Sequence, residues 1–600
     1  MGTAPGAARV PLEVWERILL LLDAGEIVRV RSVRALLTQA TRALYRAGTS
    51  LSLWRRLCAR LEARAPLPAL PADAAPEHLA STSHVTAPLL RSLERAVLFA
   101  ERLAARWDTR GARPRRVVRL RAHVNRITSL KLVVGDTHAV RGPAHVETAC
   151  WLVTGSVDGY VRVWDVNKAL CDADLDVAAD YRADDSGTEA EHASVSSDDD
   201  DDDDARRRPS MDSAVSDDPA MEIRRHARAC LVAEADTGGD ITSLDAHYDR
   251  GAQMLRIAVG SYYSSAGCLL YDLRLRTRPH VLDLSASLDP PQWSGTQCVS
   301  LLGDAVGMSR DSHTAVGTYL GSILILDTRA GTPSVLERSE RGSIAALKLF
   351  PAHVLAVTRV GQLEVYALPP PGTTAHALPI ASLALAPRAL LSVAISEPDP
   401  RTAGVLPRME HWGTPTPPRT PLSVLAVDPA GLSHFVMRPT PTPFPYALPT
   451  LDARIPMHGE RLIGAALGAS GHRAVLVSSL GGVLPVCAVR GYEQTRAADA
   501  RLVPLRPTPD TDVPADAGGL LRPASAASLS APVRTDEPPR PRAARVDSFS
   551  STSTSASSAA PSPSSRTDML TECALDEAHG LVCLASVRGA VWISDYGTCV

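Results

Sequence analysis

Residues Ala149 to Val166 read ACWLVTGSVDGYVRVWDV, and this stretch decides the class of fold. Two runs of alternating apolar residues flank the tight turn made by Val157, Asp158 and Gly159. Alternation with a period of two places every second side chain on one face of a strand, and a glycine-containing turn between two such runs is typical of a β-hairpin. The stretch therefore predicts two antiparallel strands.

Weaker copies of this hairpin follow at uneven intervals, which makes seven units in all. The six copies span Ile257 to Arg274, Thr314 to Arg329, Val354 to Leu368, Leu422 to Arg438, Ala474 to Val489 and Gly580 to Asp595. Four units have a further apolar run upstream, beginning at Ile241, Ser343, Arg461 and Leu570. Units of three to four strands are what the blades of a β-propeller need. A strand at Arg116 to Leu120 is expected to complete the last unit and close the ring, because closure removes the sheet edges.

Four residues around the first hairpin resemble the His, Ser, Asp and Trp hydrogen-bond chain of WD repeats. They are His123 in RAHVNRITSL, Ser156 and Asp158 in GSVDG, and Trp164 in VRVWD. The resemblance implies that the aspartate orients the histidine, that the histidine bonds to the serine hydroxyl, and that the indole N–H completes the chain. The implied role is rigidity of the blade and not catalysis. The chain is thus expected to contain a degenerate WD-repeat propeller over residues 115–600, with seven expected blades.

The N-terminal region has a helical pattern instead. Between Pro11 and about Arg64, apolar residues recur at spacings of three and four in three sets, and Asp23, Ala24 and Gly25 break the first helix before the second begins. Three short helices are therefore predicted over residues 10–64. Residues 65–114 are interpreted as a linker that contains one helix at 88–107.

The sequence VPLEVWERILLLLDAGEIVRVRSVR from Val10 to Arg34, followed by LWRRLC from Leu53 to Cys58, resembles the F-box family. The resemblance implies that these helices bind the Skp-type adaptor of a cullin-RING ubiquitin ligase. Because their apolar surface is larger than three short helices can bury alone, an interface is expected here; a self-contained helical bundle or a cap on the propeller is the alternative. The implied contact residues are Pro11, Leu12, Val14, Ile18, Leu19, Leu22, Ile27, Val30 and Val33.

Two long polar segments interrupt the repeats. Residues 167–228 include seven consecutive acids at Asp198 to Asp204, and residues 490–566 are rich in Pro, Ser and Ala. Such compositions cannot bury enough apolar surface to fold, so both segments are predicted to be disordered insertions. Phosphorylation could act at serines beside the acidic or basic runs; otherwise the acidic run is a solvated loop. The candidate serines are Ser194, Ser196, Ser197 and Ser210.

The net charge, the length of the apolar runs and the cysteine pattern exclude several classes of protein. The chain has 600 residues and a formal net charge of -3, so no overall field favours nucleic acid or an anionic membrane. The N-terminus has no signal-peptide pattern, and the longest apolar runs are too short to span a bilayer, which predicts a cytosolic or nuclear protein. The ten cysteines show no CxxC pair, so buried reduced thiols are expected, with no metal and no cofactor.

Phosphate-binding loops and the motifs of hydrolases and zinc proteases are absent from the sequence, so an enzyme working in the propeller channel is disfavoured. The predicted function is client recognition: the helices hold the adaptor, and the propeller binds an unidentified protein, phosphorylated or acidic, for ubiquitination and degradation. Arg126, Asp240 and Arg461 stand just before innermost strands and are the candidate client contacts, although each is also typical of a solvated loop. The alternative is a non-catalytic WD-repeat scaffold that organises a complex outside the ligase.

Overall fold

A computed structural model describes the following parts of the chain: residues 16–17, 19–20, 22, 26–27, 53–54, 56–57, 94, 97–103, 114–136, 148–172, 227–249, 252–262, 267–275, 280–288, 296–302, 313–318, 321–327, 333–338, 342–350, 353–370, 372–396, 421–440, 444, 446–456, 462–468, 471, 473–478, 482–488, 503–504 and 569–597. All of them belong to one compact unit made of residues 1–510 and 568–600. Most of them are in β-strands, and helices are few.

The described strands form seven sheets, six with four strands and one with five. Sheet 1 consists of β2 (Ile127–Asp136), β3 (Thr148–Ser156), β4 (Tyr160–Asp165) and β5 (Leu231–Asp236). Sheet 2 consists of β6 (Asp240–Asp249), β7 (Met254–Tyr262), β8 (Cys268–Arg274) and β9 (Leu282–Leu288). Sheet 3 consists of β10 (Thr296–Leu302), β11 (His313–Thr318), β12 (Ile323–Asp327), β13 (Pro333–Arg338) and β17 (Thr374–Ala377).

The remaining four sheets have the same antiparallel order. Sheet 4 consists of β14 (Ile344–Leu349), β15 (His353–Thr358), β16 (Gln362–Ala367) and β18 (Ala381–Ala384). Sheet 5 consists of β19 (Ser392–Ile395), β20 (Leu422–Asp428), β21 (Gly431–Met437) and β22 (Thr450–Pro456). Sheet 6 consists of β23 (Leu462–Leu467), β24 (Arg473–Ser478), β25 (Gly482–Ala488) and β26 (Val503–Pro504). Sheet 7 consists of β27 (Leu570–Asp576), β28 (Leu581–Ser586), β29 (Ala590–Asp595) and β1 (Arg116–Arg121).

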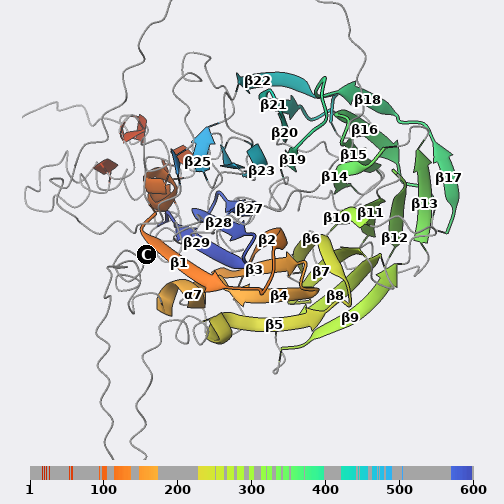
Figure 1. The fold of residues 1–600 in the computed structure, drawn as a ribbon. Helices are drawn as coiled ribbons and strands as arrows, with labels where there is room; N and C mark the ends of the chain where they lie inside the picture. The colour runs from red at the N-terminus through yellow and green to blue at the C-terminus, as the bar shows by residue number, and fades with distance from the viewer. Residues whose placement is uncertain are drawn as a thin grey trace, which may run out of the picture. The chain divides into compact units, whose positions relative to one another are not determined.

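The sheets follow one another in a closed, propeller-like arrangement (Figure 1). The first strand of each sheet contacts the first strand of the next, and β27 of the last sheet contacts β2 of the first. β1 pairs with β29 from Arg116 opposite Asp595 to Arg121 opposite Ala590. The prediction that a strand near Arg116 completes the last unit is therefore confirmed. The N-terminal strand joins the C-terminal sheet, and this pairing closes the ring without leaving an open sheet edge between the two.

Sheet 3 departs from the repeat pattern. Its fifth strand, β17, comes from the segment that follows β16 of sheet 4, and it pairs with β13 in parallel, with Val335 opposite Thr374. The sequence TAHA of β17 is too short, and its apolar residues too small, for a period of two to predict a strand.

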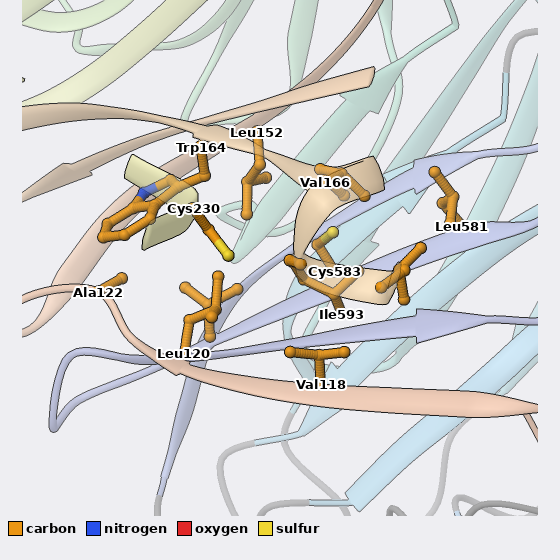
Figure 2. Packing of buried hydrophobic residues seen from close by; sticks show 14 of the residues in the cluster. Val118, Leu120, Ala122, Leu152, Trp164, Val166, Cys230, Leu581, Cys583 and Ile593 are labelled. Atoms are coloured by element: carbon orange, nitrogen blue, oxygen red, sulfur yellow. The ribbon is translucent and has the colours of Figure 1, made fainter. Parts of the chain in front are cut away.

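The core lies between neighbouring sheets. Figure 2 shows the cluster that joins sheet 7 to sheet 1, where Leu120 of β1, Leu152 of β3 and Ile593 of β29 point toward one another. Leu120, Leu152 and Ile593 are fully buried. Each fully buried leucine or isoleucine contributes roughly 1.5 to 3 kcal/mol relative to an exposed one, so this seam also holds the ring closed energetically. The short helix α7 (Val166–Asp172) follows β4 and covers the same cluster.

Apolar contacts also tie the helical residues 97–103 to the propeller. Leu103 and Phe99 pack into the cluster that contains Tyr596 and Trp592. The predicted helix at 88–107 is described at residues 94 and 97–103, all helical. Of the predicted F-box-like domain, only residues 16–17, 19–20, 22, 26–27, 53–54 and 56–57 are described. The acidic insertion is described only at its ends, and the second insertion only at residues 503–504.

Among the described residues, no helix is both long and apolar enough to cross a lipid bilayer. Seven cysteines are described as free thiols. Cys150, Cys230, Cys268, Cys298, Cys573 and Cys583 are buried, and Cys171 is exposed.

Candidate functional site: the entry rim of the propeller

Antiparallel strands place two kinds of connection at one edge of every sheet. The innermost strand begins there, and the second strand turns there into the third. We call this edge the entry rim, defined by residues 122–126, 157–159, 237–240, 342–343, 359–361, 569 and 587–589. The opposite edge, where each innermost strand ends, is the exit rim and includes residues 252–253, 577–580 and 596–597.

A buried hydrogen-bond chain fixes the entry rim of sheet 1. His123 Nδ1 lies 3.0 Å from a carboxylate oxygen of Asp158, and its Nε2 lies 2.7 Å from Thr154 Oγ1. The indole N–H of Trp164 donates to the same Thr154 oxygen at 3.0 Å. Three of the four residues predicted for the chain are thus brought together, but the hydroxyl at its centre belongs to Thr154 and not to Ser156.

The negative charge of Asp158 strengthens this hydrogen-bond chain. Burial alone would raise the pKa of Asp158, but hydrogen bonds from His123 and from the backbone N–H groups of Tyr160 and Val124 lower the pKa to about 2. Burial lowers the pKa of His123, and the Asp158 carboxylate partly offsets that shift. The hydrogen-bond chain therefore pairs the Asp158 carboxylate with the buried imidazole of His123. With its nitrogens engaged inside the blade, the imidazole has a structural role.

Ser156 has a different role, which recurs around the ring. Its hydroxyl accepts a hydrogen bond from the backbone N–H of Asp158, two residues later, and so caps the turn between β3 and β4. In other sheets the last residue of the second strand also caps the following turn, by accepting from a backbone N–H two to four residues later. The corresponding caps are Thr318 to Ser322 N, Thr358 to Gln362 N, Asp428 to Gly431 N and Ser586 to Arg588 N. The sequence signal was present: a buried Ser, Thr or Asp precedes the turn glycine in each of these units.

A second buried polar network, which was not predicted from the sequence, joins β13 of sheet 3 to β16 of sheet 4. Arg338 lies 2.6 Å from the carboxylate of Glu364 through Nη2, and Tyr366 donates its hydroxyl proton to the same carboxylate at 2.8 Å. Tyr366 is the fifth residue of β16, and Trp164 is the fifth residue of β4. Arg338 is the last residue of β13, a position close to that of His123, which follows the end of β1. Burial and the bond to Glu364 raise the pKa of Tyr366 to about 12. A different set of residues therefore fills the place of the first chain.

Exposed apolar side chains gather on the entry rim beside these networks. Val124, Met569 and Val587 are each at least 40% exposed. Backbone hydrogen bonds join their segments, because Val587 N donates to Met569 O at 2.8 Å and His123 N donates to Gly589 O at 2.9 Å. The three exposed residues therefore lie on neighbouring segments of the entry rim. The position of these segments over sheets 7 and 1 makes this part of the rim the candidate site for a protein partner.

Two of the three predicted client contacts, Arg126 and Asp240, lie at this rim. Arg126 is exposed, and its carbonyl accepts a hydrogen bond from Val157 N at 3.0 Å. Asp240 is half-buried at the start of β6, and Arg461 lies outside the described residues. Arg359 and Arg588, which were not among the predicted contacts, add exposed positive charge at this rim. The candidate phosphorylation sites Ser194, Ser196, Ser197 and Ser210 lie outside the described residues.

The predicted adaptor contacts are described at three positions. Leu19 and Ile27 are buried within the chain, each about 1% exposed, and Leu22 is half-buried. Leu53, Trp54 and Leu57 of the LWRRLC motif are also fully buried. The remaining predicted contacts, Pro11, Leu12, Val14, Ile18, Val30 and Val33, lie outside the described residues.

The helical residues 97–103 meet the propeller at the exit rim. Gly580 and Gly597 lie directly beneath them: an added Cβ would come within 2.7 Å of Leu103 at the first and 3.1 Å of Phe99 at the second. This helix therefore lies at the edge of the propeller opposite the entry rim.

Comparison with known proteins adds no family to this description. No protein-family model matches the sequence. No curated protein matches it either. Within the described ranges, no group of three or more His, Cys, Asp or Glu side chains is placed to hold a metal ion. The order and contacts of the described sheets support a propeller-like fold.

Proposed function

We propose that this chain is the client-recognition subunit of an SCF-type cullin-RING ubiquitin ligase. In this proposal the N-terminal helices bind a Skp-type adaptor, the seven sheets act as the blades of one WD-repeat-like propeller, and the entry rim binds the client. Such a subunit needs no catalytic group of its own, because the other subunits carry ubiquitin and this one supplies proximity.

The observation that carries the proposal is the placement of two surfaces. The helical residues 97–103, which follow the F-box-like segment, pack at the exit rim, and the exposed apolar residues Val124, Met569 and Val587 lie at the entry rim. A receptor has to hold adaptor and client at the same time, and a helical segment at one edge with exposed apolar residues at the other is compatible with that requirement. The F-box-like sequence supports the adaptor half, and the burial of Leu53, Trp54 and Leu57 agrees with its closing motif packing inside a helical segment.

Adaptor binding is the first test. We expect the full-length chain to bind a purified Skp-type adaptor saturably in titration calorimetry. Replacing Ile18 by aspartate should weaken binding at least 100-fold, because the interface would then bury an unpaired charge. Ile18 is chosen because Leu19 and Ile27 are buried within the chain, where a substitution would test folding instead.

The matched control is Arg56→Asp, which introduces the same aspartate side chain at an exposed position of the closing motif. It changes the charge by two units, against one unit for Ile18→Asp, and should still leave binding unchanged. Absence of binding by the unmodified chain would contradict the ligase assignment and leave a non-catalytic propeller scaffold as the function. Equal loss of adaptor binding in both variants would show that an aspartate anywhere in the N-terminal segment disrupts that segment. The assignment of Ile18 as an adaptor contact would then be wrong.

A further inference from the structure

Buried carboxylates in the described propeller almost all have a partner. Asp158 pairs with His123, Asp245 with Lys131 at 2.9 Å, and Glu364 with Arg338. Among the described buried and half-buried carboxylates of the seven sheets, two form neither a hydrogen bond nor an ion pair: Glu572 and Asp240. Both lie on innermost strands near the entry rim, on the two sheets that flank sheet 1.

The bulge at the start of the innermost strands shows which way Glu572 faces. In sheet 1 the pairing register shifts between Ile127 and Ser129. At this bulge Thr128 Oγ1 donates to the carbonyl of Ile241 at 2.6 Å, and Ser129 Oγ accepts from Leu244 N at 3.0 Å. Both side chains at the bulge therefore reach the next sheet.

Sheet 7 has the same bulge, with the register shift between Leu570 and Glu572. Thr571 and Glu572 thus stand where Thr128 and Ser129 stand in sheet 1, and by this equivalence they face β2. The Thr571 hydroxyl is buried, with 5% of the residue exposed, and has no hydrogen-bond partner in the part of the chain that the structure describes. Two adjacent polar groups are therefore directed at the seam between sheets 7 and 1, and neither forms a hydrogen bond with another described residue.

The surroundings of Glu572 differ from those of a solvated side chain. Burial raises the pKa of its carboxyl to about 8, and the charge of Arg126, which acts in the opposite direction, does not offset this. The exposed arginines of the rim are hydrated in the free protein, so their lack of a partner costs little. A half-buried carboxylate has lost part of its hydration, and a cation that reaches it gains most from pairing.

We infer that the entry rim over sheets 7, 1 and 2 binds a lysine or arginine side chain of the client, with Glu572 as its anionic partner. Asp240 supplies a second negative charge on the far side of β2. Val124, Met569 and Val587 provide apolar surface for the aliphatic stem and for neighbouring apolar residues. This inference rests on the proposed function and gives the chemical class of the client segment.

The test is selection of peptides from a random-sequence phage library on the immobilised full-length chain. Enriched peptides are expected to contain Lys or Arg beside apolar residues. Affinity for the synthetic peptide should fall at least tenfold with Glu572→Gln, and equally when norleucine replaces the peptide's lysine. Glu337→Gln is the matched control, since the partner of Glu337 among the described residues is the exposed His376 on an outer strand. Thermal unfolding should show that Glu572→Gln folds, because the carboxylate has no partner to lose.

The pH dependence gives an independent readout. A pKa of about 8 keeps the Glu572 carboxyl mostly protonated at pH 7, and a bound cation favours its ionised form. Affinity for a lysine peptide should therefore rise roughly five- to tenfold between pH 7 and pH 8.5 in the unmodified chain, and stay level in Glu572→Gln. Among the described residues, the charged side chain that acts on the Glu572 carboxyl is Arg126, since Lys131 of β2 is paired with Asp245 of β6.

Three results would overturn the inference. They are peptides that bind Glu572→Gln as tightly as the unmodified chain, enriched peptides that are acidic and depend on Arg126, and a library that yields no peptide dependent on Glu572. Adaptor binding measured on the same proteins separates this failure from failure of the proposed function. If adaptor binding persists, the ligase assignment stands while the cation site is wrong; if the adaptor never binds, the peptide result still holds for a scaffold.

Discussion

Replacement of Arg338 by methionine is expected to lower the free energy of unfolding by about 3 to 5 kcal/mol, the largest effect of any single change proposed for this protein. The side chains of Arg338 and Glu364 are 2% and 5% exposed, and their closest N–O distance is 2.6 Å. The variant would leave the Glu364 carboxylate buried with only the Tyr366 hydroxyl as a donor. Urea denaturation followed by tryptophan fluorescence and circular dichroism would measure the loss.

Two controls sharpen this prediction. Changing both partners, with Arg338→Met and Glu364→Leu, should restore much of the stability, because no uncompensated charge remains in the core. Glu337→Gln, one residue away but in an exposed pair with His376, should change stability by less than about 0.5 kcal/mol. A double variant no more stable than the single one would show that the cost comes from lost packing and not from the unpaired carboxylate.

Thr154→Val should lower the free energy of unfolding by about 2 to 4 kcal/mol, although the threonine and valine side chains have nearly the same shape. The change removes the one oxygen that bonds both His123 Nε2, at 2.7 Å, and Trp164 Nε1, at 3.0 Å. Each buried polar group left without a partner costs roughly 1 to 3 kcal/mol. The same denaturation measurement applies.

Ser156→Ala provides the comparison for Thr154→Val. It removes a turn cap, whose loss costs roughly 0.5 to 2 kcal/mol by analogy with helix caps, and it leaves the hydrogen bonds of His123 in place. A larger loss for Ser156→Ala than for Thr154→Val would contradict the assignment of Thr154 as the central hydroxyl.

The β architecture could be predicted because its signal is local. Alternation around Val157 to Gly159 marked the hairpin, and the same alternation at Arg116 to Leu120 marked the strand that closes the ring. β17 escaped prediction because its four residues pair with a neighbouring sheet, and a pairing between distant segments leaves no periodic pattern in a short strand.

The polar networks were harder to predict for a related reason. Thr154 and Ser156 lie two residues apart on one strand, so alternation places both hydroxyls on the same face and spacing alone cannot separate their roles. The network of Arg338, Glu364 and Tyr366 joins residues 26 and 28 positions apart. A glutamate in the middle of the buried run QLEVYA was the available sign that a cationic partner had to exist.

The candidate binding surface was only partly visible in the sequence. Arg126 and Asp240 were selected for their place before innermost strands, and both lie at the entry rim. Glu572 was not selected, because its lack of a partner is a property of the assembled ring and cannot be read from LTECALD alone. The F-box-like contacts stay a prediction, since most of them lie outside the described residues.

The central claim is that this chain brings a client to a ubiquitin ligase, and the most direct measurement is protein turnover in cells where the Leu12→Ala, Ile18→Ala variant replaces the unmodified chain. Quantitative mass spectrometry after inhibition of protein synthesis would report half-lives across the proteome. The proposal predicts that a small set of proteins becomes long-lived in this variant and again in Glu572→Gln. Unchanged half-lives in the adaptor-contact variant, with adaptor binding lost, would contradict the claim and identify the protein as a scaffold.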